Sequence, residues 1–332
     1  MKKRILMLAT GGTIASRESS QGLAPAITSE ELLGYVPGIG GLCRVETVQL
    51  MNLDSTNVGP SHWLSIARAI EAQYWDYDGF VVTHGTDTMA YTAAALSYLI
   101  QRSPKPIVLT GSQRSICMED TDARMNLYNA FLYAAAEGSR GVSLVFDGKV
   151  ISGTRARKER TKSFNAFSSV DYPELAIIRD GRLIRYLAEL DHTDGPEFFH
   201  CLEERVLLLT LIPGMGADAL SALRDSYQAV ILQSFGVGGV PGGSSGPFAR
   251  AMEDWLRAGK TIVMMTQVPY EGSDMAVYQV GYQVKEKYQL MEAYSMTLEA
   301  AATKLMWILG QTRDPEEVRR LFYQPVQWDI IR

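Results

Sequence analysis

Short apolar runs alternate with amphipathic stretches along the first half of the chain. The apolar runs cover residues 5–9, 45–50, 79–83, 106–110 and 142–146, and the amphipathic stretches cover residues 29–35, 61–74, 88–100 and 122–136. Runs of this length indicate buried strands, and the amphipathic stretches indicate helices that pack on them. The alternation predicts an α/β fold with a doubly wound, mostly parallel sheet covered on both faces.

The alternation stops at residues 190–205, a stretch without periodicity that contains Asp191, Gly195 and Pro196. It then resumes, with predicted strands at 206–212, 229–233 and 261–266 and predicted helices from residue 217 and at 247–258, 297–309 and 315–322. A chain of 332 residues is also long for one hydrophobic core. We therefore predict a larger N-terminal domain at 1–189, a linker at 190–205 and a smaller C-terminal α/β domain at 206–332.

The composition argues against several classes of protein. With 46% hydrophobic residues, 21% charged residues and a net charge of −5, the chain is ordinary for a globular protein and lacks the basic surface typical of nucleic-acid binding. No run is long enough to span a membrane, and the run 5–9 after the basic start is too short for a signal peptide. Cys43, Cys117 and Cys201 follow no disulfide or zinc spacing, so we expect a soluble cytoplasmic protein.

Polar loops follow the predicted strands of the first domain at residues 10–16, 52–57, 84–87 and 110–114. Doubly wound sheets bind ligands beyond the carboxyl ends of their strands, so these loops are the first place to look for chemistry. In the first loop, Gly11 and Gly12 permit a sharp turn, and Thr13 offers a hydroxyl that a base can activate as a nucleophile. The same residues also fit a plain turn in which Thr13 starts another strand.

Two further segments combine structural and chemical possibilities. Thr86 and Asp87 precede a predicted helix, where either side chain can cap free N–H groups and where an ionised Asp87 would suit a substrate ammonium group. His84 lies at a strand end beside a glycine, so a structural role is favoured over that of a general base. Lys158 lies in the basic run 155–162, which fits a solvated face or an anion site as well as a catalytic lysine.

The segments 10–16 and 84–89 read Thr-Gly-Gly-Thr-Ile-Ala-Ser and His-Gly-Thr-Asp-Thr-Met, and they resemble the two signatures of the bacterial-type L-asparaginases. Both motifs are long, stand in the right order and follow predicted strands. The resemblance covers most of the chain and includes residues 52–55, Lys158 nine residues before Phe167, the loop 236–238 and the helix 296–301. The closing helix and the missing signal peptide resemble the cytoplasmic type I branch.

The resemblance implies a hydrolase of asparagine catabolism that converts L-asparagine to L-aspartate and ammonia. Thr13 matches the nucleophile that forms an acyl-enzyme. Thr86, Asp87 and Lys158 match the hydrogen-bonded catalytic group that activates a hydroxyl or a water. Thr86 and Asp87 would also bind the substrate, with Asp87 at its α-amino group.

The resemblance further assigns Asp54 and Ser55 to the α-carboxylate and amine of the substrate, and backbone N–H groups near Thr86 and Ser112 to a developing oxyanion. It implies that the N-terminal domain is catalytic. It also implies that the enzyme needs no metal and no cofactor, has no nucleic-acid or membrane partner, and forms a homodimer or homotetramer with its sites between subunits.

Four positions depart from the family pattern. The family commonly has a tyrosine in the lid after the first signature and often an asparagine after the Gly-Val-Gly loop, where this chain has Leu23 and Gly239. Some type I members bind asparagine at an allosteric site with a cysteine and a threonine, where this chain has Val268 and Arg157. We therefore expect a different cover over the nucleophile and no allosteric control of that kind.

Other functions compete with this interpretation. Residues 242–246 fit the Gly-x-Ser-x-Gly pattern, but every histidine of the chain precedes them, whereas a nucleophile elbow needs its histidine later. Residues 259–261 resemble the end of a P-loop, but a predicted helix precedes them and a predicted strand follows. Residues 236–241 nearly match a dinucleotide-binding fingerprint but end in proline. The asparaginase-like amidotransferase subunit carries an extra N-terminal domain, for which a first strand near residue 3 leaves no room. An amidohydrolase that prefers glutamine or D-asparagine and a non-catalytic amino-acid-binding homologue stay as alternatives.

Overall fold

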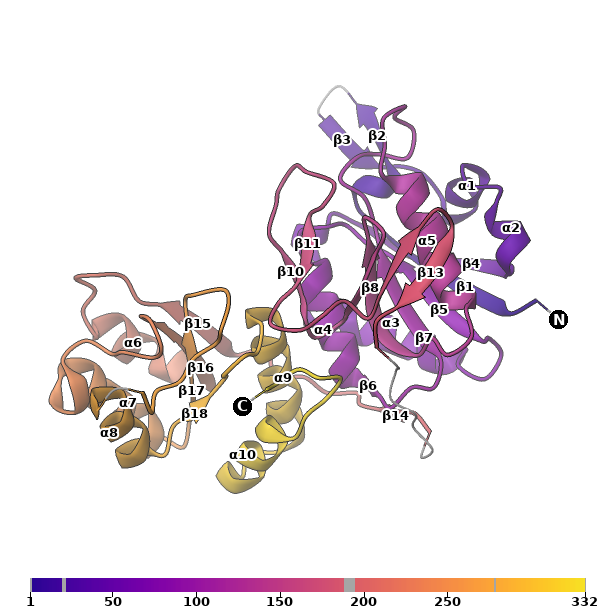
Figure 1. The fold of residues 1–332 in the computed structure, drawn as a ribbon. Helices are drawn as coiled ribbons and strands as arrows, with labels where there is room; N and C mark the ends of the chain where they lie inside the picture. Colours follow the sequence, from indigo (N-terminus) through magenta and orange to yellow (C-terminus); the bar gives the residue numbers. More distant parts are fainter. Residues whose placement is uncertain (1, 20–21, 188–194, 278, 332) are drawn as a thin grey trace. The chain divides into compact units, whose positions relative to one another are not determined.

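The computed structural model describes residues 2–19, 22–187, 195–277 and 279–331 (Figure 1). The chain forms two compact units, Met1–His200 and Cys201–Arg332. The predicted linker at 190–205 lies partly outside the described residues. Among the helices that are described, none is long and apolar enough to cross a membrane.

The N-terminal unit is built on a mixed sheet whose described strands follow the order β13-β12-β9-β8-β7-β5-β1-β4. Their bounds are β1 (Arg4–Gly11), β4 (Arg44–Leu53), β5 (Gly79–Thr83), β7 (Pro106–Thr110), β8 (Gly141–Phe146), β9 (Lys149–Ser152), β12 (Ala176–Arg179) and β13 (Arg182–Arg185). The strands from β8 to β4 are parallel, which confirms the predicted parallel core. Strands β5, β7 and β8 are buried along their whole length, because parallel sheets are covered on both faces.

The helices of this unit are α1 (Ser29–Gly34), α2 (Ile39–Leu42), α3 (Pro60–Ala72), α4 (Met89–Leu99) and α5 (Ala123–Ala135). Local signals mark the starts of α1 and α3. At α1, Glu31 N donates to Thr28 Oγ1 at 3.2 Å and Thr28 N donates to Glu31 Oε2 at 2.8 Å, which makes a capping box. Pro60 opens α3, at a position where its missing N–H is not needed.

The strand order places the reversal of winding between β1 and β5. From β1 the chain crosses to β4 on one side, and then to β5, β7 and β8 on the other. Loops that leave the carboxyl ends of strands at such a point diverge and leave room for a ligand. The loops 10–16 and 84–87 leave β1 and β5 at this point, so the fold itself brings the two motifs together.

The C-terminal unit is a smaller α/β unit, as predicted, and its described strands form a parallel sheet with the order β15-β16-β17-β18. Its elements are β15 (Val206–Thr210), α6 (Asp218–Leu223), η3 (Arg224–Ser226), β16 (Ala229–Ser234), η4 (Gly243–Ser245), α7 (Pro247–Arg257), β17 (Thr261–Thr266), α8 (Gln279–Tyr288), β18 (Met291–Glu292), α9 (Leu298–Gln311) and α10 (Pro315–Tyr323). Trp255 of α7 is fully buried in its core, and Trp255 Nε1 donates to Leu220 O at 2.8 Å.

The hydrophobic pattern did not predict several short elements. They are the strand pairs β2 (Ser16–Ser19) with β3 (Gly22–Pro25), β6 (Ile100–Gln101) with β14 (Glu197–Phe198), and β10 (Ala156–Lys158) with β11 (Phe167–Ser169), the strands β9, β12 and β13, the turns η1 (Thr13–Ala15) and η2 (Ser55–Asn57), helices α2 and α8, and strand β18. Strands of two to four residues have too few positions to display a period. Turns at Asp147-Gly148 and Asp180-Gly181, all with φ between 50° and 71°, join the antiparallel strands β8 to β9 and β12 to β13.

Candidate active site

Three loops meet at the carboxyl ends of β1, β4 and β5, and glycines allow them to meet. A Cβ on Gly12 would lie 2.4 Å from the backbone of Gly85, and a Cβ on Gly85 would lie 2.6 Å from Ser55 Oγ. Only glycine permits contacts this close. Gly12 also has a φ of 81°, and its N–H donates to Leu53 O at 2.9 Å. The predicted loops are therefore held in direct contact.

Thr13 begins the turn η1 immediately after the Gly12–Gly85 contact. The chain makes a 3₁₀ turn there and does not continue as a strand. Ile14 and Ala15 are buried, whereas Thr13 is half-buried. Its hydroxyl has no hydrogen-bond partner among the described residues. The hydroxyl is thus available to a ligand at this edge of the sheet.

Lys158 meets the second signature. Its Nζ donates to Thr86 Oγ1 at 2.8 Å and to Asp87 Oδ1 at 2.6 Å. Thr86 is buried and the Lys158 side chain is 15% exposed, but the Asp87 side chain is 57% exposed. Lys158 lies on β10 opposite Phe167 of β11, whose ring packs on Phe146 with 5.0 Å between centroids. The β10–β11 strand pair, packed on Phe146, therefore positions the Lys158 amine, and the Asp87 carboxylate stays open to a ligand.

Ser55 joins this group through its backbone and its hydroxyl. Asp87 N donates to Ser55 Oγ at 3.2 Å, and Thr88 Oγ1 donates to Ser55 O at 2.6 Å. The Asp54 carboxylate is engaged within its own turn, because its Oδ1 accepts from the N–H and the hydroxyl of Thr56, each at 2.9 Å. The structure therefore brings Ser55, Thr86, Asp87 and Lys158 together by hydrogen bonds, and it places Asp54 beside them as the cap of η2.

His84 is a buried structural residue of the loop that contains Thr86 and Asp87. The ring is fully buried, with Nδ1 2.7 Å from Gly85 O and Nε2 2.9 Å from Thr92 Oγ1, which also accepts from Trp63 Nε1 at 3.0 Å. Burial lowers the pKa of His84 to about 4, so the ring is neutral at pH 7. Both ring nitrogens are engaged, which confirms the structural role favoured from sequence.

Gln113 belongs to the same network, although no motif pointed to it. Thr86 Oγ1 donates to Gln113 Oε1 at 3.2 Å, and Gln113 Nε2 donates to Ser163 O at 3.1 Å and Arg160 O at 3.4 Å. Only its position relative to the strands could have identified Gln113. Gln113 lies in the loop after β7, and β7 pairs with β5, so its side chain is within reach of Thr86.

The structure does not favour two of the sequence alternatives. Turn η4 of the Gly-x-Ser-x-Gly segment lies between β16 and α7 and does not directly follow a strand, as a nucleophile elbow must. Lys260 of the segment 259–261 donates to Arg224 O and Tyr227 O, so its amine already has structural partners. Among the described residues, no group of three or more His, Cys, Asp or Glu side chains has an arrangement that could hold a metal ion.

Both halves of the chain match known family models. Residues 4–190 match the model "Asparaginase, N-terminal", and residues 205–322 match the model "Glutaminase/Asparaginase C-terminal domain". The chain belongs to the asparaginase family. All six candidate residues, from Thr13 to Lys158, lie within the first match.

The asparaginase-family match extends to single proteins along their whole length. The chain is 37% identical to the L-asparaginase of Thermococcus kodakarensis, with 98% of this chain and 99% of that protein covered. It is 34% identical to L-asparaginase 1 of Escherichia coli K12, with 99% and 98% covered. The solved structure of the thermostable L-asparaginase from Thermococcus kodakarensis superimposes with a TM-score of 0.91 at 35% identity and covers 99% of both chains. The chain is therefore an amidohydrolase of this family, as its two signatures predicted.

Proposed function

We propose that this enzyme hydrolyses L-asparagine to L-aspartate and ammonia, with Thr13 as the nucleophile. The observation that carries the proposal is the hydrogen-bonded group of Thr86, Asp87 and Lys158 beside the glycine contact from which Thr13 emerges. Among the described residues the Thr13 hydroxyl has no hydrogen-bond partner, and Thr86, which follows the Gly12–Gly85 contact in the chain, binds Lys158 together with Asp87. These are the parts that nucleophilic amide hydrolysis requires.

The proposed reaction has two halves. Thr13 Oγ attacks the carbon of the side-chain amide, and the Thr13 proton is passed to the leaving nitrogen, which departs as ammonia and leaves an ester on Thr13. A water then attacks this ester, gives a proton back to Thr13 and releases aspartate. Negative charge develops on the former amide oxygen in both halves, and backbone N–H groups near Thr86 and Ser112 are its proposed donors.

Proton transfer is assigned to the group around Lys158. In the present arrangement Lys158 Nζ donates to Thr86 Oγ1, and the Thr86 hydroxyl donates to Gln113 Oε1. Lys158 Nζ and Thr86 Oγ1 are groups that can exchange a proton at hydrogen-bond distance, and we assign to them the transfer of the proton from Thr13 or from water to the leaving group. Gln113 Oε1 only orients the Thr86 hydroxyl. Asp87 keeps the Lys158 amine in place through the 2.6 Å contact.

Substrate recognition is assigned to the exposed side of the same group. Asp87 is the proposed partner of the α-ammonium group, because its carboxylate is more than half exposed and lies near the start of α4. Ser55 and Thr86 are the proposed hydroxyl contacts of the substrate. Asp54 is a proposed contact of the amine or carboxylate end, which requires its carboxylate to exchange Thr56 for the substrate.

The test is steady-state ammonia release with L-asparagine, D-asparagine and L-glutamine as separate substrates. We expect the highest kcat/KM for L-asparagine. A higher value for L-glutamine or D-asparagine would replace the substrate assignment but keep the amidohydrolase, and a flat result for all three would reject it. Thr10→Val is a matched control for Thr13→Ala, because the Thr10 hydroxyl of the same loop donates to Thr83 O at 2.8 Å.

Two further properties complete the proposal. We propose a homodimer or homotetramer, which light scattering coupled to size-exclusion chromatography distinguishes from a monomer. We also propose a cytoplasmic location, which fractionation of cells that express the full chain tests. A monomer with full activity would contradict the expectation that sites form between subunits.

A further inference from the structure

Asp122 binds the loop that follows β7. Its Oδ2 accepts from Gln113 N at 2.9 Å, and its Oδ1 accepts from Gln113 N and from Arg114 N, each at 3.1 Å. Asp122 is only 8% exposed, so these bonds form away from most of the solvent. Burial raises the pKa of Asp122, and the backbone N–H groups act in the opposite direction.

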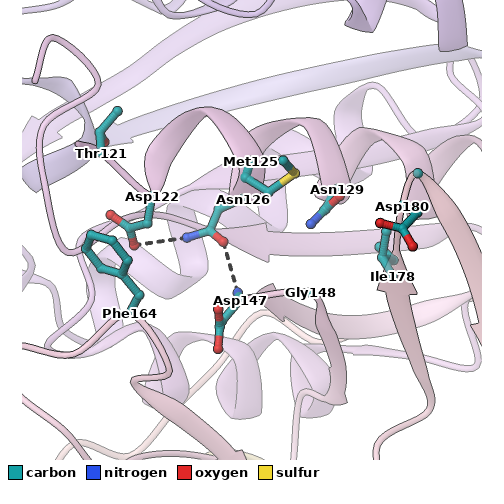
Figure 2. A pocket seen from close by; sticks show the side chains of 11 residues that line it. Thr121, Asp122, Met125, Asn126, Asn129, Asp147, Gly148, Phe164, Ile178 and Asp180 are labelled. Carbon is teal, nitrogen blue, oxygen red and sulfur yellow. Dashed lines mark hydrogen bonds between the residues drawn. The ribbon is translucent and has the colours of Figure 1, made fainter. Parts of the chain in front are cut away.

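Asn126, one turn further along α5, completes this network. Figure 2 shows its amide between Asp122 on one side and the turn at Asp147 on the other. Asn126 Nδ2 donates to Asp122 Oδ2 at 3.1 Å and to Gly111 O at 3.0 Å, and its Oδ1 accepts from Asp147 N at 2.9 Å. With 1% exposure, Asn126 is effectively sealed from solvent. One amide thus ties α5 to the loops after β7 and β8.

The loop held in this way leads directly to the candidate active site. Its residue Gln113 accepts the hydroxyl hydrogen of Thr86, the same hydroxyl that accepts from Lys158. At the other end of the loop, a Cβ on Gly111 would lie 2.2 Å from His84 O, so the backbone is packed against the end of β5. Asp122 fixes the consecutive backbone N–H groups of Gln113 and Arg114, at the end of the loop that contacts Thr86.

A carboxylate this buried would be a poor choice if only packing were needed. Taking a carboxylate out of water costs several kcal/mol unless hydrogen bonds compensate, and an apolar side chain of the same size avoids that cost. The three N–H donors are arranged around both oxygens of Asp122. This arrangement gives the loop a single geometry, which packing of a flexible apolar side chain does not provide.

We infer that Asp122 and Asn126 are positioning residues for the amide chemistry: they hold the loop 111–114 so that Gln113 orients Thr86 and Ser112 offers its N–H to the developing oxyanion. The inference rests on the proposed function. Neither residue is expected to touch the substrate. Because the loop acts on charge that develops in the transition state, its displacement lowers kcat more than it changes KM.

Asp122→Asn is the first test, because it keeps the size of the side chain and replaces one acceptor by an NH₂ group that faces N–H donors. We expect kcat for ammonia release to fall about 10- to 100-fold and KM to stay within about threefold. Loss of a merely structural residue would lower the unfolding midpoint and the folded fraction, with kcat per folded molecule unchanged. An unchanged kcat therefore overturns the inference.

Asp180→Asn is the matched control. Asp180 lines the same cavity of about 500 Å³ as Asp122, is exposed, and has no hydrogen bond to its side chain among the described residues (Figure 2). The substitution Asp180→Asn removes the same charge as Asp122→Asn and should keep the wild-type kcat.

A second readout separates this inference from the proposed function. Amide hydrogen exchange at Gln113 and Arg114 should be at least about tenfold faster in Asp122→Asn than in the wild type and unchanged in Asp180→Asn. This comparison holds even for a wild type that releases no ammonia, a result that would reject only the proposed function. Equal exchange in the wild type and Asp122→Asn would overturn the positioning role. If Asp122→Asn does not fold, Asn126→Ser gives the same comparison.

Discussion

Each unit contains a lysine–aspartate salt bridge, and the two have nearly the same N–O distance but differ in solvent exposure. In the N-terminal unit Lys158 Nζ lies 2.6 Å from Asp87 Oδ1, and in the C-terminal unit Lys304 Nζ lies 2.7 Å from Asp329 Oδ2. The Asp87 side chain is 57% exposed, whereas the side chains of Lys304 and Asp329 expose no surface at all. The first pair is open to a ligand, and the second is closed inside a core.

The two pairs also differ in their other hydrogen-bond partners. Lys304 Nζ also donates to Gln324 O at 2.7 Å, and Asp329 Oδ1 accepts from Val326 N at 2.9 Å, so this pair ties α9 to the segment after α10. Lys158 instead donates to the hydroxyl of Thr86, which can itself exchange a proton. The length of an ion pair therefore does not reveal its role, whereas its exposure and its additional partners do.

Lys158→Met should produce the largest effect, and on activity alone. We expect kcat for ammonia release to fall by about 10³-fold, because Lys158 is the proposed proton-transfer group. The free energy of unfolding should change by less than about 1 kcal/mol, because an ion pair with an exposed partner contributes little to stability. Urea unfolding and steady-state kinetics on the same preparation check both parts. A large loss of stability with unchanged kcat would make this pair structural.

Lys304→Met should show the opposite pattern. Removing the amine takes the charged partner away from the fully buried Asp329 carboxylate, which should lower the free energy of unfolding by about 3–5 kcal/mol. The measurement is urea unfolding, with kcat determined on the fraction that is folded. We expect kcat per folded molecule to stay within about twofold of the wild type. A stable Lys304→Met variant with low kcat would contradict the contrast between the two pairs.

The buried His84 ring should make the free energy of unfolding depend on pH. The pKa of His84 is about 4 in the folded chain and 6.5 when unperturbed, so the unfolded chain binds more protons between these values. The His84 contribution is complete above pH 6.5 and is lost as the pH falls toward 4, by up to about 3 kcal/mol. Urea unfolding from pH 7 to pH 4 should show a steeper decline for the wild type than for His84→Gln. Parallel profiles would show that His84 does not contribute.

The double variant Lys304→Met/Asp329→Leu should have the smallest effect. Replacing both members of a buried pair by apolar side chains of similar size leaves no buried charge, and the cost comes from hydrogen bonds such as those to Gln324 O and Val326 N, so we expect a stability within about 2 kcal/mol of the wild type. Its unfolding curve, measured beside that of Lys304→Met, isolates the penalty of burying the carboxylate without its lysine. If the double variant is as unstable as the single one, the loss comes from packing and not from charge.

The hydrophobic pattern predicted the parallel core well because buried strands such as β5 and β7 are continuous apolar runs. It did not predict β9, β12 and β13, whose short length hides their period, although the Asp-Gly pairs at 147–148 and 180–181 mark their turns. The same limit hid β10, so Lys158 was found through the family resemblance and not through its strand.

The candidate site was predictable wherever a motif carried it. Thr86 and Asp87 stand side by side in the chain, and the contacts of Gly12 and Gly85 follow from what glycine permits. Gln113 and Asp122 were not predictable, because their roles depend on hydrogen bonds across strands and to backbone N–H groups that leave no motif. For Asp54 the motif was present but did not reveal the local contact, in which its carboxylate caps η2.

In the proposed mechanism Thr13 carries the covalent intermediate. A rapidly quenched reaction with L-asparagine, followed by mass spectrometry of the intact chain and of its peptides, tests this role of Thr13. We predict an aspartyl adduct on the peptide that contains Thr13, no adduct in Thr13→Ala, and a kcat at least about 10³-fold lower in that variant. An adduct on a different residue, or a Thr13→Ala variant with wild-type kcat, would show that Thr13 is not the nucleophile.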